Sequence, residues 1–319
     1  MVKRISIISQ QGALLEGLLE EIAASSFQDA QISLINAAVD CKTSSVLHKG
    51  RPLGFSFIDD YTFEEDDLVL ILESDIVVSA YCDQLAAISC PVIGFYKDIS
   101  SLKPMLYQGG TNSTSSVYGV LEPMASALKM LLKGFTIEAL DIKAMFSAEL
   151  MGQAGITELA SQTAKLLNSQ PLEHHVFGKQ LPFNFYPILG NPLSQHLQDS
   201  LVGQFELAFD ISEIHLLPLQ MPVFHGQTLL VSTILSDAVD LSNLLAQWDA
   251  DERIALIKDP LSVSHLEIAN VDANVMVGCY SISASDEHRL DFWVTIDENP
   301  FMISETLMPL SELLLNNSL

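Results

Sequence analysis

The first 125 residues alternate short apolar runs with helical segments, and this order restricts the fold more than any other feature of the chain. A strand-like run at Ile5–Ile8 is followed by an amphipathic helix over Gly12–Ala24 and a second strand at Gln31–Ala37. The continuous apolar runs Leu68–Leu72 and Pro91–Phe95 are typical of strands buried on both faces. Strands that alternate with helices in this way predict a doubly wound, mostly parallel sheet.

Three further segments complete the first part of the chain. Arg51–Asp60 alternates apolar and polar residues, which predicts an exposed or antiparallel strand. Ser74–Ser89 is expected to form one helix, and Pro123–Leu132 another, with its proline in the first turn.

The second half has a different character, with five strand-like runs around two helices. It predicts an α+β domain on a broad antiparallel sheet, of the kind that often pairs with a second subunit. The final stretch, Met302–Leu315, is amphipathic and helical, with Leu307, Leu310 and Leu314 in one stripe. The predicted strands are Ile137–Phe146, Glu213–Pro218, Gln227–Ser236, Ala273–Ser283 and Leu290–Ile296, and the predicted helices are Gly155–Asn168 and Leu193–Phe209.

Composition excludes several classes of function. Residues are 49% hydrophobic and 17% charged, enough for two buried cores, and no apolar run is long enough for a membrane span. A net charge of −25 repels nucleic acid and opposes anionic cofactors. The four cysteines are scattered and are expected to be reduced, so we expect a cytoplasmic protein that binds neither membrane nor nucleic acid.

Three stretches in the second half resemble the aspartate-semialdehyde dehydrogenase family. "LPFNFYPILG" at 181–190 resembles its A-F-N-x-x-P segment, and "LQMPVFHGQT" at 219–228 resembles its R-V-P-V-x-R-G-H-S signature. "GQAGITEL" at 152–159 is similar to the end of its S-G-A-G-x-x-G-x-x-E-L turn and helix. The resemblance covers essentially the whole chain. It implies a Rossmann-like domain of residues 1–122 plus 302–319, and an α+β dimerisation domain of the semialdehyde dehydrogenase type over 123–301.

Active members of that family bind NADP on a glycine-rich turn, and the resemblance places this turn at Ser9–Leu15. Only Gly12 remains there, and bulky Leu15 stands where a third glycine lets a helix pack closely on a strand. A second cofactor loop aligns with Leu72–Asp75 and offers two carboxylates to a phosphate that needs backbone N–H groups. We therefore expect no cofactor, with Gly12 as a remnant of its site.

Active members also use a cysteine nucleophile, a histidine acid/base, a glutamine beside the thioester and two arginines for the substrate. The resemblance carries these groups, in that order, onto Pro123, Gln227, Phe146, Gln220 and His225. Proline has no nucleophilic atom, and a neutral amide neither shuttles a proton at pH 7 nor clamps a carboxylate. We therefore expect these five positions to be degenerate and the protein to have no catalytic residues. His225 could still act as a base, but the sequence places no cysteine near it.

The resemblance is thus to the degenerate, USG-1-like branch of the family. The leading hypothesis is a homodimeric scaffold, interaction or small-ligand-binding protein, whose further partner is an active dehydrogenase or a small ligand. The alternative is an active NAD(P)-dependent semialdehyde dehydrogenase of aspartate-family amino-acid biosynthesis, with a rewired site and NADP as cofactor. No metal site is expected, because neither His174-His175 nor Glu64–Asp67 has the spacing of metal ligands.

Overall fold

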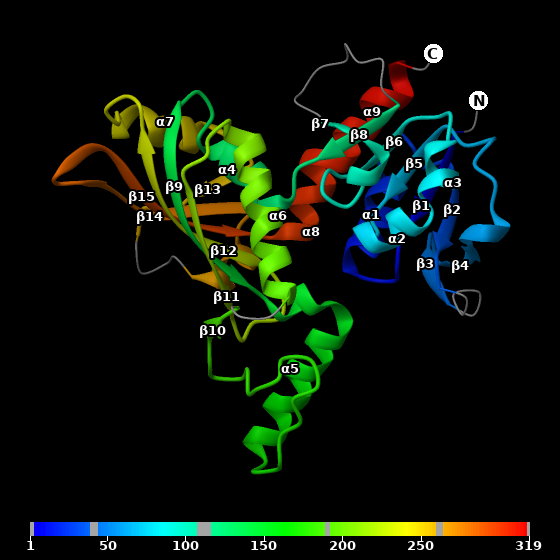
Figure 1. The fold of residues 1–319 in the computed structure, drawn as a ribbon, viewed down its shortest axis with the longest axis horizontal. Helices are drawn as coiled ribbons and strands as arrows, with labels where there is room; N and C mark the ends of the chain where they lie inside the picture. Colours follow the sequence, from blue (N-terminus) through cyan, green and yellow to red (C-terminus); the bar gives the residue numbers. More distant parts are fainter. Residues whose placement is uncertain (1–2, 39–43, 107–115, 189–191, 260–263, 318–319) are drawn as a thin grey trace. The chain divides into compact units, whose positions relative to one another are not determined.

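The structure is a computed structural model that describes residues 3–38, 44–106, 116–188, 192–259 and 264–317. The chain divides into two compact units, each with its own sheet (Figure 1). The first unit combines Met1–Glu122 with Met302–Leu319, and the second is Pro123–Phe301. Within the described ranges, no helix combines the length and apolar character needed to cross a bilayer.

The first unit is built on an eight-stranded sheet in the order β3-β4-β2-β1-β5-β6-β8-β7. All its pairings are parallel except that of β3 with β4. The strand order reverses between β1 and β5, so the predicted doubly wound sheet is confirmed. Ligands of such sheets bind at the carboxyl ends of the strands beside this switch point. The strands are β1 (Arg4–Ile8), β2 (Gln31–Asn36), β3 (Ser45–His48), β4 (Arg51–Phe57), β5 (Leu68–Ile71), β6 (Val92–Phe95), β7 (Met105–Leu106) and β8 (Val117–Val120).

Two expectations for this unit need correction. The single helix expected over Ser74–Ser89 is wrong, because the segment forms α2 (Asp75–Ala80) and α3 (Cys82–Ala86). Tyr81 separates them with φ −111° and ψ 19°, outside the helical region. The strand expected at Arg51–Asp60 ends at Phe57, and it pairs with β3 on one side and, in parallel, with β2 on the other.

The C-terminal segment belongs to the first unit from Met302 onward and is not one regular helix. α8 (Glu298–Met302) continues through a π-helical turn, Ile303–Leu307, into α9 (Met308–Asn317). A Cβ atom placed on Gly17 of α1 (Ala13–Ala24) would lie 3.0 Å from Ile303 Cδ1, so the glycine lets α1 approach this turn closely. The predicted stripe Leu307, Leu310 and Leu314 is buried.

The second unit is built on a seven-stranded sheet in the order β10-β11-β9-β12-β15-β14-β13. The sheet is mixed, because β11 pairs with β9, and β13 with β14, in parallel. Its strands are β9 (Ile137–Phe146), β10 (Tyr186–Pro187), β11 (Ile214–Gln220), β12 (Gln227–Leu235), β13 (Ile254–Leu256), β14 (Val275–Ser283) and β15 (Asp286–Ile296), and its main helices are α4 (Pro123–Leu131), α5 (Gly152–Leu167), α6 (Pro192–Phe209) and α7 (Leu241–Ala250).

The two faces of this second sheet differ in character. Along β9, the alternate residues Leu140, Ile142 and Ala144 are buried, on the face against which α4 and α6 lie (Figure 1). The residues between them, including Asp141 and Lys143, project to the opposite face and are partly exposed. We call this second side the open face, defined by Asp141, Lys143, Leu230, Ser232, Asp291 and Trp293.

The position of the C-terminal helix predicts that Leu310→Ala will destabilise the first unit. Leu310 is 0% exposed, and truncating a buried leucine costs about 2–5 kcal/mol. Hydrogen exchange of the β1 and β5 amides, which belong to the first unit, measures this loss. Asn316→Ala, at an exposed position of the same helix, should change the opening free energy by less than about 0.5 kcal/mol. Equal protection of these amides in both variants would contradict the assignment of the helix to this unit.

Candidate functional site

Three of the positions that the resemblance aligns with catalytic or substrate-binding residues lie in one row across the second sheet. Phe146 ends β9 and is the register partner of both Gln220, at the end of β11, and Gln227, at the start of β12. Ile296 of β15 continues the row beyond Gln227. Directly opposite residues have Cβ atoms about 5 Å apart and project to the same face of a sheet. The structure therefore brings these three side chains together at one end of the sheet.

Gln220 fastens the strand ends that carry this row. Its Nε2 donates to the carbonyl oxygens of Phe146 at 3.1 Å, Ser147 at 2.9 Å and Met221 at 3.4 Å, and the residue is 1% exposed. Three carbonyl acceptors on one side fix the orientation of the amide, because a flipped Oε1 would face them all. Gln220 Oε1 has no hydrogen-bond partner among the described residues. The side chain joins β9 to β11 and carries no charge for a substrate.

The other two members of the row are equally unsuited to proton transfer. Phe146 is 3% exposed and offers only an apolar ring. Gln227 is a neutral amide, and its buried Oε1 finds no hydrogen-bond partner in the described part of the chain. A general acid or base needs a group that titrates near the working pH, and neither side chain has one.

His225 lies in the loop before β12. Its Nδ1 is 2.9 Å from Glu149 Oε2, and its side chain is 54% exposed. Cys279, the one cysteine of the second unit, lies in β14, four residues beyond Val275. Val275 is the register partner of Ile296, so Cys279 is displaced from the row by about 13 Å along the strand. Within the described part of the second unit, the row therefore has no adjacent thiol that His225 could activate.

A carboxyl cluster that sequence reasoning missed flanks the same row. Glu149 follows β9, and Asp297 and Glu298 follow Ile296. Glu298 is 8% exposed, and burial, together with the charge and hydrogen bonding of Glu149, raises the pKa of Glu298 to about 9. Burial and Glu149 also raise the pKa of Asp297. Glu298 is therefore protonated at pH 7, since a buried carboxyl group beside a second carboxyl group keeps its proton.

Nearby groups hold this cluster in position. Asn299 Nδ2 donates to Glu149 Oε1 at 3.0 Å. His265 Nε2 lies 2.5 Å from the carbonyl oxygen of His225, and its Nδ1 lies 3.0 Å from Thr228 Oγ1. Burial lowers the pKa of His265, so this ring adds little positive charge. The one sequence signal for the cluster was the acidic pair that follows a buried strand, and nothing in the sequence linked that pair to distant Glu149.

Pro123 and Met124 occupy the segment aligned with the nucleophile. Pro123 is the first residue of α4, and both residues are buried. Proline suits this position because the first N–H of a helix has no intrahelical acceptor. The helix start is thus well formed without a nucleophilic side chain.

The motif residues that remain have identifiable structural roles. Gly152 and Gly226 have φ of 61° and 88°, values that favour glycine, and a Cβ on Gly226 would also meet His265 Cε1 at 2.7 Å. Glu158 accepts the backbone N–H groups of residues 175–177 at 2.8, 2.7 and 3.1 Å. Asn184 donates from Nδ2 to the carbonyl oxygen of Gln180 at 3.0 Å. These contacts hold turns and loops whether or not the site is catalytic.

The cofactor turn does not fit a pyrophosphate. Gly12 precedes α1 with φ 175°, extended backbone that any residue adopts, and Leu15 is 1% exposed within the core. At the switch point, Glu73 is 4% exposed, and its Oε2 accepts from Gln10 Nε2 at 3.3 Å. Burial raises the pKa of Glu73. A buried carboxyl group thus lies where an anionic ligand would need donors.

The described ranges contain neither a candidate metal site nor a disulfide bond. No group of three histidine, cysteine, aspartate or glutamate side chains there has an arrangement that could hold a metal ion. Cys82, Cys90 and Cys279 form no disulfide within those ranges, and Cys41 lies outside them.

Two kinds of known protein are similar to this chain in sequence. A USG-1 protein homolog from Azotobacter vinelandii is 24% identical over 309 residues, which cover 92% of each chain. Another from Pseudomonas aeruginosa is 22% identical over 316 residues, again with 92% of each chain. An aspartate-semialdehyde dehydrogenase from Vibrio mimicus is 28% identical over 180 residues, which cover 54% of this chain and 57% of that enzyme.

Solved structures agree with the fold. The structure of a probable aspartate-semialdehyde dehydrogenase from Pseudomonas aeruginosa matches with a TM-score of 0.81 at 20% identity, over 96% of this chain and 100% of that one. The family model for the semialdehyde dehydrogenase dimerisation domain matches residues 128–299, more than half of the chain. The chain therefore belongs to the semialdehyde dehydrogenase family, as a USG-1-like member with a Rossmann-like unit and the dimerisation domain of that family.

Proposed function

We propose that this protein is a catalytically degenerate member of the family that serves as a scaffold, interaction or small-ligand-binding protein. The observation that carries the proposal is the row Gln220–Phe146–Gln227. By the resemblance, these positions hold an arginine, a glutamine and a histidine in active members. The same backbone register here presents two neutral amides and an apolar ring, so the row has neither the base nor the cation of that chemistry.

Two further observations support the absence of dehydrogenase chemistry. Pro123 at the start of α4 supplies no nucleophilic atom where the resemblance places the cysteine. The buried carboxyl group of Glu73 opposes a dinucleotide at the switch point of the first sheet. The positions of the nucleophile, the acid/base and the cofactor site thus all differ from those of the active members.

The alternative is an active NAD(P)-dependent semialdehyde dehydrogenase with a rewired site. It rests on the 2.9 Å contact between His225 and Glu149, an imidazole–carboxylate pair of the kind that acts in acid/base catalysis. It also requires an NADP site and a nucleophile at positions that the resemblance does not indicate. Binding of NADP separates the two proposals, because only the enzyme needs it.

We also propose that the protein forms a two-fold homodimer through the open face of the second sheet. Leu230 is 37% exposed at the centre of this face and is the register partner of Lys143 and Trp293. The family model that matches residues 128–299 describes a dimerisation domain, and this range contains all seven strands of the second sheet. A sheet face with exposed apolar side chains is an aggregation hazard unless a partner covers it. A second copy is the simplest such partner.

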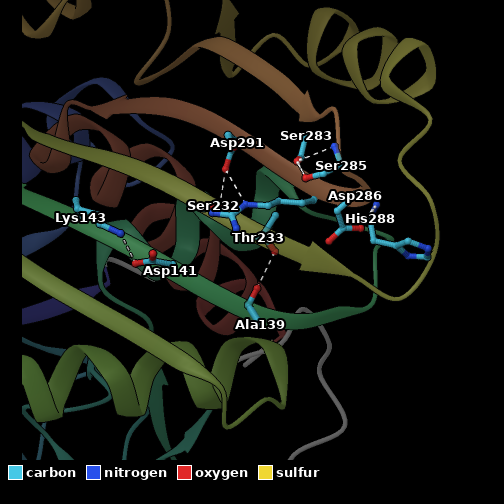
Figure 2. A network of polar contacts seen from close by, with 11 residues as sticks. Ala139, Asp141, Lys143, Ser232, Thr233, Ser283, Ser285, Asp286, His288 and Asp291 are labelled. Atoms are coloured by element: carbon cyan, nitrogen blue, oxygen red, sulfur yellow. Dashed lines mark hydrogen bonds and ion pairs between the residues drawn. The ribbon is translucent and has the colours of Figure 1, made fainter.

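The charges on this face are already paired within one chain. Lys143 forms an ion pair with Asp141, and Ser232 donates to Asp291 (Figure 2). Arg289 Nε lies 3.5 Å from Asp291 Oδ1. Buried charges are tolerated when they are paired and hydrogen-bonded. The face can therefore be covered without leaving an isolated charge.

The proposed loss of the cofactor site predicts that NADP will not bind. Millimolar NADP should give no heat of binding in calorimetry at pH 7.5, because Leu15 and Glu73 oppose the pyrophosphate. The thermal unfolding midpoint should also be unchanged by NADP, since a ligand that binds the folded state raises it. A dissociation constant in the micromolar range would contradict the proposal and favour the enzyme.

The proposed dimer predicts that Leu230→Glu will separate the subunits. The new carboxylate would be buried against its symmetry mate, so sedimentation at about 1 µM should show a single chain of 34.9 kDa, whereas the unmodified protein should have twice that mass. Leu207→Glu is a matched control, because Leu207 is also 37% exposed but lies on α6, against the opposite face. A dimeric Leu230→Glu variant, or a monomeric unmodified protein, would contradict this interface.

A further inference from the structure

A cavity of about 770 Å³ lies in the second unit, at the end remote from the row. The C-terminal ends of α4 and α7 and the turn into β13 form its walls, and we call it the α4–α7 groove (Figure 1). Gly134 on its wall lies three residues before the start of β9, whereas Phe146 of the row ends that strand. Because a strand rises about 3.3 Å per residue, the row lies roughly 30 Å further along. Cavities of about 300–1,000 Å³ suit small organic ligands.

The floor of the groove is apolar and well packed. Leu131, Trp248 and Ile254 line it, and each is at most 8% exposed. Trp248 Nε1 donates to the carbonyl oxygen of Leu131 at 2.8 Å, so the indole ring joins the ends of the two helices. The same ring lies against those of Phe292 and Tyr280, at centroid distances of 5.6 Å and 6.4 Å. The floor is thus a preformed surface for an apolar side chain.

Charged groups of both signs line the rim. Arg253 donates to the carboxylate of Asp251 from Nε at 2.7 Å and from NH2 at 2.5 Å, which holds the guanidinium in place. These hydrogen bonds, and to a smaller degree the charge of Lys133, lower the pKa of Asp251. Lys133, Asp251 and Arg253 together carry one positive charge, and Glu252 adds a negative charge to the lining. Neither Lys133 nor Glu252 has a hydrogen bond or ion pair within the described ranges.

This arrangement disfavours simple ions of either sign. The net charge of −25 opposes an anion throughout the protein. The positive charge shared by Lys133 and Arg253 opposes a cation at their side of the groove. A molecule that is neutral overall but carries both charges avoids the first repulsion and can pair each of its ends with an opposite charge.

We propose that the α4–α7 groove binds a small zwitterion with an apolar side chain, of the α-amino acid class. The carboxylate of the ligand accepts from Lys133 beside Arg253, its ammonium group donates to Glu252, and its side chain lies on Trp248. Both polar contacts are charge-assisted hydrogen bonds. The inference rests on the small-ligand-binding function proposed above and names a ligand class for it. It does not depend on the loss of catalysis, because no position aligned with a catalytic residue lines the groove.

The first test titrates the protein with L-phenylalanine at pH 7 and follows the indole N–H resonance of Trp248 by NMR. The chain has two tryptophans, so the indole signal that remains in Trp293→Phe belongs to Trp248. L-Phenylalanine should shift this signal with a dissociation constant of about 1–10 mM, as expected for a ligand of this size in an open groove. 2-Phenylethylamine, which lacks the carboxylate, and 3-phenylpropanoate, which lacks the ammonium group, should each bind about fivefold more weakly.

Two variants assign the ligand charges to residues. Lys133→Gln should weaken L-phenylalanine about fivefold without weakening 2-phenylethylamine, which has no carboxylate for this lysine. Glu252→Gln should weaken L-phenylalanine by a similar factor without weakening 3-phenylpropanoate. Lys129→Gln, on α4 but outside the groove lining, and Glu138→Gln, at an exposed position of β9, make the same charge changes. These two controls should leave all three affinities within about twofold of the unmodified protein.

Three results would overturn the inference. No shift of the Trp248 signal at about 50 mM L-phenylalanine would show that the groove does not bind an amino acid. Equal affinities for the three ligands would show apolar contact without recognition of charge. Equal losses in the control variants would show that overall charge, and not the rim, determines affinity. None of these results bears on NADP, so the proposed loss of catalysis would stand, whereas binding of NADP would contradict that loss whatever L-phenylalanine does.

Discussion

The antiparallel pairing of β9 with β12 is the constraint on which the second unit depends. This register places Gln227 opposite Phe146, and the parallel pairing of β11 places Gln220 on the other side of the same residue. A slip of one residue would move every side chain of β12 to the other face of the sheet. The same register buries Leu229 and Val231 and leaves Leu230 exposed, so it determines both the site and the open face.

This dependence explains how the family framework persists while the side chains at the aligned positions differ. In this chain, Gly226 supplies the positive φ of the turn before the row, and Gln220 ties the strand ends together through three hydrogen bonds. The carboxylate of Glu158 holds the loop at 175–177 by accepting three backbone N–H groups. None of these contacts requires a nucleophile, a base or a cofactor. The positions that differ from active members, Pro123 and Gln227 among them, are compatible with the same turns and strands.

The sequence allowed much of the fold to be predicted, because its apolar periodicity reports burial directly. The runs at Ile5–Ile8 and Leu68–Leu72 form neighbouring central strands, and β9 has the expected bounds. β15 ends at Ile296 as expected but begins at Asp286, before the predicted Leu290. The break at Tyr81 was missed because the apolar pattern continues across it. The π-helical turn at Ile303–Leu307 was missed for a similar reason, since a single wide turn keeps the buried stripe of leucines nearly in line.

The candidate site was predictable only in part. The resemblance identified the positions of Phe146, Gln220 and Gln227, but their arrangement in one row follows from strand register, which periodicity does not specify. Glu149 and Glu298 are far apart in the sequence, so their proximity could not be predicted from it. The sequence around each one is equally consistent with a solvated surface glutamate. Burial, which creates the unusual proton affinity of Glu298, emerges only when the strands are assembled.

The central claim is that no side chain of this protein forms a covalent intermediate with an aldehyde substrate of the family. Intact-mass spectrometry after incubation with NADP and aspartate semialdehyde, quenched in acid, tests the claim directly. The active enzymes, with their cysteine nucleophile, are expected to gain the mass of one acyl group through a thioester. We predict that this protein keeps the 34.9 kDa mass of the unmodified chain at every time point. A stoichiometric, hydroxylamine-sensitive adduct on Cys279 or any other residue would contradict the account.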